Sequence, residues 1–89
     1  LGYIEDGPNL VTLAMNGWAE GDPAWWLNLK ANPEATVETA EDTRAVRASE
    51  ATGAERDRIW SRLQDVYDEA DIYAPQRATR TAVVILEPR

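Results

Sequence analysis

The 89 residues carry a net charge of −7, which indicates one small acidic domain. With a single lysine and scattered arginines, the chain lacks the clustered basic residues of a nucleic-acid-binding face, so no nucleic-acid partner is expected. The absence of Cys and His excludes disulfides, thiol chemistry and a Cys- or His-based metal site, so no metal is expected. No apolar run approaches the roughly 18 residues of a membrane-spanning helix, and the sequence predicts a cytoplasmic protein.

The N-terminal part predicts a β-hairpin followed by a loop. Leu1 to Glu5 has the pattern of a strand, which ends at the turn formers Asp6 to Asn9. Leu10 to Met15 is an almost continuous apolar run, which indicates a strand covered on both faces. The segment from Asn16 to Gly21 then reads as a loop with two glycines and Trp18. Because Leu1 is not an initiator methionine, we expect a fragment of a longer chain.

Asp22 to Pro33 predicts a short helix that carries two adjacent tryptophans. Asp22 is the expected N-cap and Pro23 suits the first helical position, whereas Pro33 ends the helix. At helical spacing Trp25 shares a face with Asn28, Leu29 and Asn32. A helix this short cannot bury two indoles alone, so it must lie across a sheet or a planar ligand. Asn28 and Lys30 are expected to hold the helix against neighbouring loops, and Lys30 lies within reach of Trp26 for a cation–π contact.

The second half predicts another hairpin, a longer helix and a final strand. Ala35 to Thr39 and Arg44 to Ala51 alternate apolar and polar residues, as half-buried strands do. The sequence from Thr52 to Glu55 matches a capping box that opens a helix running to about Ala70. Thr81 to Leu86 is the most hydrophobic strand. The expected inward-facing side chains of this helix are Ile59, Leu63, Val66 and Ala70, widened by Trp60 and Tyr67.

The order β-β-α-β-β-α-β predicts an α+β domain over residues 1–89, with a mostly antiparallel sheet or barrel and two helices. Five short strands close poorly into a barrel, so an N-terminal strand is expected upstream. The usual catalytic constellations are absent, and the sixteen carboxylates read as a solvated surface. What remains is the concentration of Trp18, Trp25 and Trp26 around one loop. These indoles either line a site for a planar ligand or fill the core.

Several segments together resemble the deazaflavin-dependent nitroreductase family, whose members use coenzyme F-420. The most specific is DPAWWLNLKANP, from Asp22 to Pro33, and the similarity spans nearly the whole chain. It continues through the segments Leu1–Ile4, Ala35–Glu38, Thr52–Trp60 and Val83–Pro88. The resemblance implies a split β-barrel related to flavin-binding reductases, and an oxidoreductase that passes a hydride from reduced F-420 to a quinone or nitro-compound. FMN is the less favoured cofactor.

By the same resemblance, Ala14, Met15, Asn16 and Gly17 border the deazaflavin ring or its phosphate through backbone N–H groups, and Trp25 lies near the ring. The family also has an upstream basic segment, Gly-Arg-Lys-Ser/Thr-Gly, that holds the anionic part of the coenzyme. This chain begins after that segment, which is also the part that would mediate peripheral membrane contact.

Tyr73 matches a tyrosine on the substrate side of the family pocket. It is expected to hydrogen-bond the acceptor oxygen or donate a proton to it; a rim tyrosine without a catalytic part is the alternative. Ala70 and Gln76 stand where the family can have further aromatic residues. Two other functions stay open: a module that binds deazaflavin or flavin without turnover, and an interaction domain that forms homodimers through open strand edges such as Leu1 to Ile4.

Overall fold

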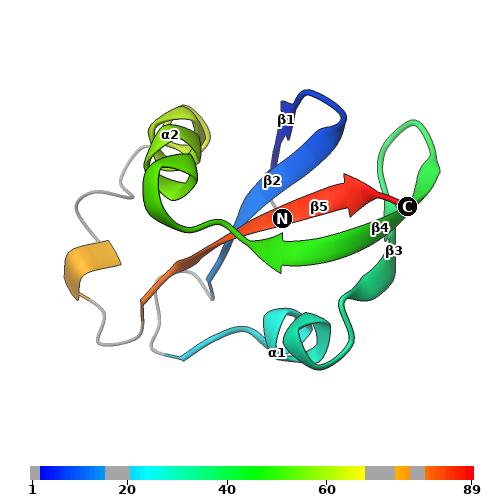
Figure 1. Ribbon diagram of the computed structural model, residues 1–89, viewed down its shortest axis with the longest axis horizontal. Helices are drawn as coiled ribbons and strands as arrows, with labels where there is room; N and C mark the ends of the chain where they lie inside the picture. Colours follow the sequence, from blue (N-terminus) through cyan, green and yellow to red (C-terminus); the bar gives the residue numbers. More distant parts are fainter. Residues whose placement is uncertain (1–2, 16–20, 68–73, 77–79) are drawn as a thin grey trace.

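The computed structural model describes residues 3–15, 21–67, 74–76 and 80–89, which form an antiparallel five-stranded sheet with a helix against each face (Figure 1). The strand order is β1-β2-β5-β4-β3. The strands are β1 (Ile4–Asp6), β2 (Asn9–Ala14), β3 (Glu34–Glu38), β4 (Thr43–Glu50) and β5 (Ala82–Pro88). The helices are α1 (Ala24–Ala31) and α2 (Gly53–Leu63), with a 3₁₀ turn η1 (Ala74–Gln76). The predicted order and the α+β class are confirmed, and the sheet is not closed, as expected for a split barrel.

The last strand, β5, lies at the centre of the sheet and joins two hairpins. One hairpin is β1–β2, and its strand β2 pairs with β5 from Leu10 opposite Leu86 to Ala14 opposite Ala82. The other hairpin is β3–β4, and β4 pairs with the opposite edge of β5. The predicted burial of β2 on both faces follows from this arrangement, because each face of the sheet carries a helix, and β5, predicted as the most hydrophobic strand, is buried in the same way.

Two hydrophobic clusters, one on each face, form the core. The cluster under α1 consists of Leu10, Ala14, Trp26, Val46, Ala48, Ala82, Val84 and Leu86. The cluster under α2 consists of Val11, Leu13, Ala51, Ile59, Leu63, Val83 and Ile85. The alternation along β2 and β5 divides their side chains between these clusters, as the period of two in a strand requires. Trp60 and Tyr67 pack beside the second cluster, as predicted.

The structure corrects three expectations about the helix ends. Asp22 is not the N-cap of α1; Pro23 holds that position without a side-chain hydrogen bond, and Asp22 instead pairs with Lys30 at 3.3 Å. Thr52 is the N-cap of α2, but its side chain makes no capping hydrogen bond, so the capping box is not formed. Helix α2 ends at Leu63, earlier than predicted. Val66 therefore lies beyond the helix and is 42% exposed instead of joining the core, and residue 70 is outside the described residues.

A cluster of charged groups ties the β1–β2 hairpin to α2. The Asp6 carboxylate accepts hydrogen bonds from Arg58 Nη1 and Nη2 at 3.0 and 2.9 Å, and from Arg62 Nη1 at 2.8 Å. Arg62 Nη2 also donates to the backbone carbonyl of Glu5 at 2.7 Å. The hydrogen bond from Arg58 is the main reason that the pKa of Asp6 lies below its ordinary value of 3.8. Gly7, with a φ of +60°, lets the chain turn directly after Asp6.

We expect Asp6→Asn to make thermal stability less dependent on acidic pH. Because the folded-state pKa of Asp6 is lowered, its ion pairs stabilise the domain above the unfolded pKa of about 3.9. This stabilisation is lost as the pH falls through the lower folded-state pKa. The variant should therefore melt at a lower temperature than the wild type at pH 7, and the two melting temperatures should converge at a pH below the folded-state pKa of Asp6. An equal difference at both pH values would show that the Asp6 charge is not what stabilises this contact.

A candidate ligand-binding cavity between α1 and the sheet

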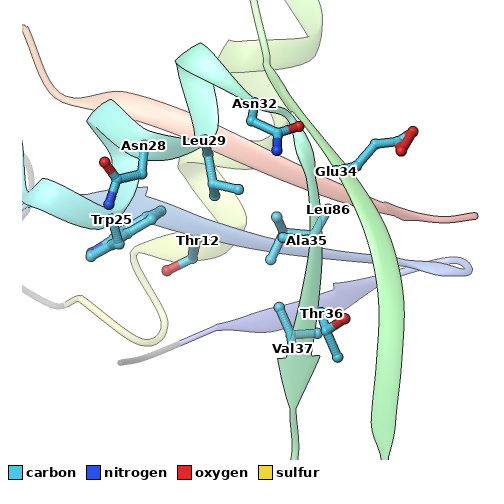
Figure 2. Close-up of a pocket in the computed structure, with 10 residues that line it drawn as sticks. All are labelled: Thr12, Trp25, Asn28, Leu29, Asn32, Glu34, Ala35, Thr36, Val37 and Leu86. Atoms are coloured by element: carbon cyan, nitrogen blue, oxygen red, sulfur yellow. The ribbon is translucent and has the colours of Figure 1, made fainter.

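A cavity of about 480 Å³ lies between α1, β3 and the face of the sheet that α1 covers (Figure 2). Helix α1 supplies Trp25, Asn28 and Leu29, with Asn32 just after it. These are the four residues that the sequence places on one helical face. The opposite walls are Thr12, Glu34, Ala35, Thr36, Val37 and Leu86. The cavity therefore has helix α1 on one side, and the edge strand β3 with the sheet on the other.

The two adjacent tryptophans have separate roles. Trp26 is 3% exposed and belongs to the cluster under α1, so the core-filling alternative holds for this residue. Trp25 is half-buried and lines the cavity, with its ring centroid 6.4 Å from that of Trp26 and an interplanar angle of 63°. Lys30 Nζ lies 5.7 Å from the Trp26 ring centroid, which confirms the predicted cation–π contact. Its ion pair with Asp22 fixes the start of α1, as the predicted role of Lys30 requires.

The cavity walls are mostly apolar, with a few polar groups. Figure 2 shows Asn28 and Leu29 extending from α1 beside the Trp25 ring, while Val37 approaches from β3. Glu34 lies at the rim, where its carboxylate pairs with Arg47 at 3.5 Å. An aromatic wall with a small number of amide and hydroxyl groups is the usual composition of a site for a flat organic ligand.

A second cavity of about 330 Å³ continues along the inner face of the sheet toward β1. It shares Thr12, Val37 and Leu86 with the first cavity. Its other lining residues are Tyr3, Leu10, Glu38 and Thr39. The shared residues make the two cavities neighbouring parts of one trough, bounded by β1 and β2 on one side and β3 on the other.

The predicted site residues do not all lie at the cavity in the part of the chain that the structure describes. Trp25 lines the cavity, as a residue near a planar ligand should. Ala14 is fully buried in the cluster under α1, whereas Met15 packs against the cluster under α2, so their side chains lie on opposite faces of the sheet. The proposed contact of Ala14 and Met15 with a ligand through backbone N–H groups stays a prediction. Asn16, Gly17 and Tyr73 lie outside the described residues.

The described residues fit a flat ring better than an anionic group. Trp25, Leu29 and Val37 offer apolar contact to a ring, whereas no lysine or arginine is among the described residues that line either cavity. The phosphate and acidic tail of a deazaflavin coenzyme would therefore need cationic partners elsewhere. Within the described ranges, His, Cys, Asp and Glu form no group of three or more that could hold a metal ion.

Sequence reasoning missed the cavity residues of β2 and β5. Thr12 and Leu86 read as ordinary strand residues, and no local pattern indicates which edge strand faces α1. The alternation of β3 correctly predicted Ala35 and Val37 as inward-facing residues. Strand β3 is an edge of the sheet, and its side chains Ala35 and Val37 line the cavity beside α1.

Comparisons with known proteins agree with this fold and identify the family. The family model for F420H(2)-dependent quinone reductase matches residues 1–88. The Mycobacterium tuberculosis protein named "Putative F420H(2)-dependent quinone reductase Rv3178" is 34% identical over 87 residues, covering 98% of this chain and 73% of that protein.

Two solved structures are similar, each at 26% identity over 98% of this chain. One, described as a domain-swapped dimer, has a TM-score of 0.87, and this chain spans 66% of its length. The other, titled as an F420-H2 dependent reductase (FDR-A), has a TM-score of 0.86, with 77% of its length covered. The match of the family model over residues 1–88 and the 34% identity to the Mycobacterium tuberculosis protein lead to one conclusion: this chain belongs to the F420H(2)-dependent quinone reductase family.

Proposed function

We propose that this domain is an oxidoreductase that catalyses reduction of a quinone by reduced coenzyme F-420. The observation that carries the proposal is the apolar cavity with Trp25 on one wall and Ala35 and Val37 on the other. Quinones are flat and electron-poor, so they suit a cavity with an aromatic wall. Nitro-compounds share these properties and are the second class of acceptor that we propose.

The coenzyme, when bound, supplies the hydride; the chain supplies binding, orientation and exclusion of water. Trp25 and Leu29 would cover the faces of a flat ring, and the side-chain amide of Asn28 would bond an oxygen or nitrogen at its edge. We propose that the backbone from Ala14 to Gly17 and the phenol of Tyr73 complete the site. A domain that holds the coenzyme without turnover is the alternative.

Filling the cavity tests the proposal. Ala35→Phe places a large side chain in the cavity, and we expect it to weaken binding of 2-methyl-1,4-naphthoquinone by roughly tenfold or more, equivalent to about 1.4 kcal/mol. Ala45→Phe is the matched control, because Ala45 is exposed on the neighbouring strand β4. Tryptophan fluorescence quenching measures affinity, and oxidation of reduced F-420 measures turnover. Binding without turnover in the wild type would favour the non-catalytic module, whereas equal affinity in both variants would place the quinone elsewhere.

We also propose that the domain forms homodimers. Strands β1 and β3 are the two edges of the open sheet, and one structural neighbour is described as a domain-swapped dimer. Light scattering over a concentration series would detect the dimer. Cytoplasmic residence and peripheral membrane contact stay predictions from the sequence. None of the helices in the described part of the chain is long and apolar enough to cross a membrane.

A further inference from the structure

Two arginines at the α2 side of the domain differ from the other cationic side chains that the structure describes. In these ranges, no ion pair or hydrogen bond joins the side chain of Arg56 or Arg80 to an acceptor. The chain carries sixteen carboxylates and only nine lysines and arginines, so unpaired arginines need an explanation. The side chains that do bond a carboxylate or a carbonyl are Lys30, Arg44, Arg47, Arg58, Arg62 and Arg89.

The guanidinium group of Arg56 is held in place but has no acceptor at one of its nitrogens. Its Cζ lies 5.2 Å from the ring centroid of Trp60, one helical turn further along α2, in a cation–π contact. Nη1 of Arg56 is buried and has no hydrogen-bond partner. A buried charged donor without an acceptor costs free energy. The contact with the indole therefore fixes a donor for which the chain supplies no acceptor.

The second arginine, Arg80, precedes β5 and lies close to Arg56. The N–H of Ala51 donates to the carbonyl of Val83 at 2.9 Å, which holds the segment before α2 against the start of β5. Burial lowers the pKa of Arg56 below its ordinary value, and repulsion from Arg80 lowers it further. Arg80 is itself exposed to solvent. Two like charges are thus neighbours at this place, where a bound anion would relieve their repulsion.

The carboxylates around Arg56 do not take the place of such an anion. Glu50 and Asp57 attract Arg56, but neither forms an ion pair with it. Both carboxylates are exposed, so water screens their charge. Their attraction offsets only part of the effects of burial and of Arg80, because the pKa of Arg56 is lowered overall.

We infer that Arg56 and Arg80 together bind a phosphate or carboxylate group, at a site on the α2 side of the domain. Guanidinium groups bind such oxyanions through two parallel N–H···O bonds. Neither arginine is among the described residues that line the two cavities, so this site is separate from them. Ala82 pairs with Ala14, which places Arg80 at the end of the sheet where β2 ends. A free anion and the anionic part of a coenzyme both have the required chemistry.

The test uses inorganic phosphate as the probe and arginine variants of the full chain. Arg56→Gln and Arg80→Gln each remove one guanidinium group. Arg44→Gln is the matched control, because it removes the same charge from an arginine that pairs with Asp42. Heteronuclear NMR titrations at constant ionic strength locate the phosphate and give its Kd. Thermal melts establish that each variant folds, and the exposed Arg80 supplies a second variant if Arg56→Gln does not fold.

We expect phosphate to shift the NMR signals of the Trp60 indole and the Arg56 side chain in the wild type, and chloride to leave them unchanged. Arg56→Gln and Arg80→Gln should each weaken phosphate binding by roughly tenfold or more, because each removes a charge-assisted hydrogen bond. Arg56→Lys should retain only part of the affinity, because lysine keeps the charge but lacks the planar fork of donors. Arg44→Gln should bind phosphate as the wild type does.

A second pair of ligands identifies the source of the oxyanion. F-420 carries a phosphate and an acidic tail, whereas 8-hydroxy-5-deazariboflavin has the same ring system without them. A loss of F-420 affinity in Arg56→Gln and Arg80→Gln, with unchanged affinity for the deazariboflavin, would show that the site holds the anionic part of the coenzyme. A loss of affinity for inorganic phosphate alone would show that it holds a separate anion. Either result supports the inference.

Two results would contradict the inference. One is that Arg56→Gln and Arg80→Gln change the affinity for neither phosphate nor F-420. The other is an equal loss in Arg44→Gln, which would show an effect of net charge instead of a site. The proposed function fails separately: a wild type that binds phosphate through these arginines but neither binds nor reduces a quinone would overturn the proposed function and leave this inference standing.

Discussion

Replacement of Trp26 by alanine should lower the free energy of unfolding by about 3–5 kcal/mol, the usual cost of removing a large buried aromatic side chain. Trp26 is 3% exposed and packs among the residues of β2, β4 and β5 under α1. Its removal leaves a space that the short helix cannot fill by moving. For a domain of 89 residues such a loss is a large part of the total stability. Urea denaturation followed by circular dichroism measures it.

Trp25→Ala is the matched control, because the same side chain is removed one position earlier in the same helix. Trp25 lines the cavity and is half-buried, so its loss should reduce stability less and weaken ligand binding by roughly tenfold, the value of one aromatic contact. Melting curves with and without F-420 and quinone distinguish the two effects. Equal losses of stability in the two variants would contradict the separate roles that we assign to the two indoles.

Tyr73→Phe should lower turnover by roughly 10²–10⁴-fold if Tyr73 donates a proton to the acceptor, since general acid catalysis contributes about this much. The change removes only the hydroxyl, so coenzyme affinity and thermal stability should be retained. Simple orientation through one hydrogen bond would cost only a few-fold. Steady-state rates with a quinone and a nitroaromatic compound, measured with coenzyme affinity, distinguish these cases. Tyr73 lies outside the described residues, and its role rests on the family resemblance.

The other two tyrosines supply controls for that experiment. Tyr3 is 43% exposed at the second cavity, so Tyr3→Phe should leave turnover unchanged. Tyr67→Phe is the second control; it removes a phenol whose oxygen lies 3.3 Å from Thr12 Oγ1. A wild-type rate in Tyr73→Phe would make Tyr73 a rim residue. A larger loss of turnover in Tyr67→Phe than in Tyr73→Phe would assign the proton-donating role to Tyr67.

Local patterns predicted the elements of this fold well, because strand and helix periods act over a few residues. The spacing of Trp25, Asn28 and Leu29 even predicted one wall of the cavity. Helix ends were less predictable. Asp22 finds a better partner in Lys30 than in the free N–H groups of α1, and α2 ends before the apolar spacing does, which leaves Val66 exposed.

The opposite wall could not be predicted, because it depends on contacts between distant parts of the chain. Thr12 is an unremarkable strand residue in the sequence, and only the packing of the segment after α2 brings Tyr67 to it, 55 residues away. The separation of Ala14 from Met15 follows directly from strand alternation, but the resemblance treated the two residues as one loop. Resemblance thus identified the family, whereas the side-chain geometry came from the structure.

The central position of β5 also has a consequence for synthesis on the ribosome. The two hairpins, β1–β2 and β3–β4, are local in sequence, but each joins the sheet through β5, which follows all the other strands. The nascent chain therefore cannot complete either hydrophobic cluster before Ala82 to Pro88 has left the exit tunnel. Until then the inner edges of β2 and β4 lack the partner that covers them in the folded domain, and these are the edges at which a nascent chain is exposed to aggregation or to a chaperone.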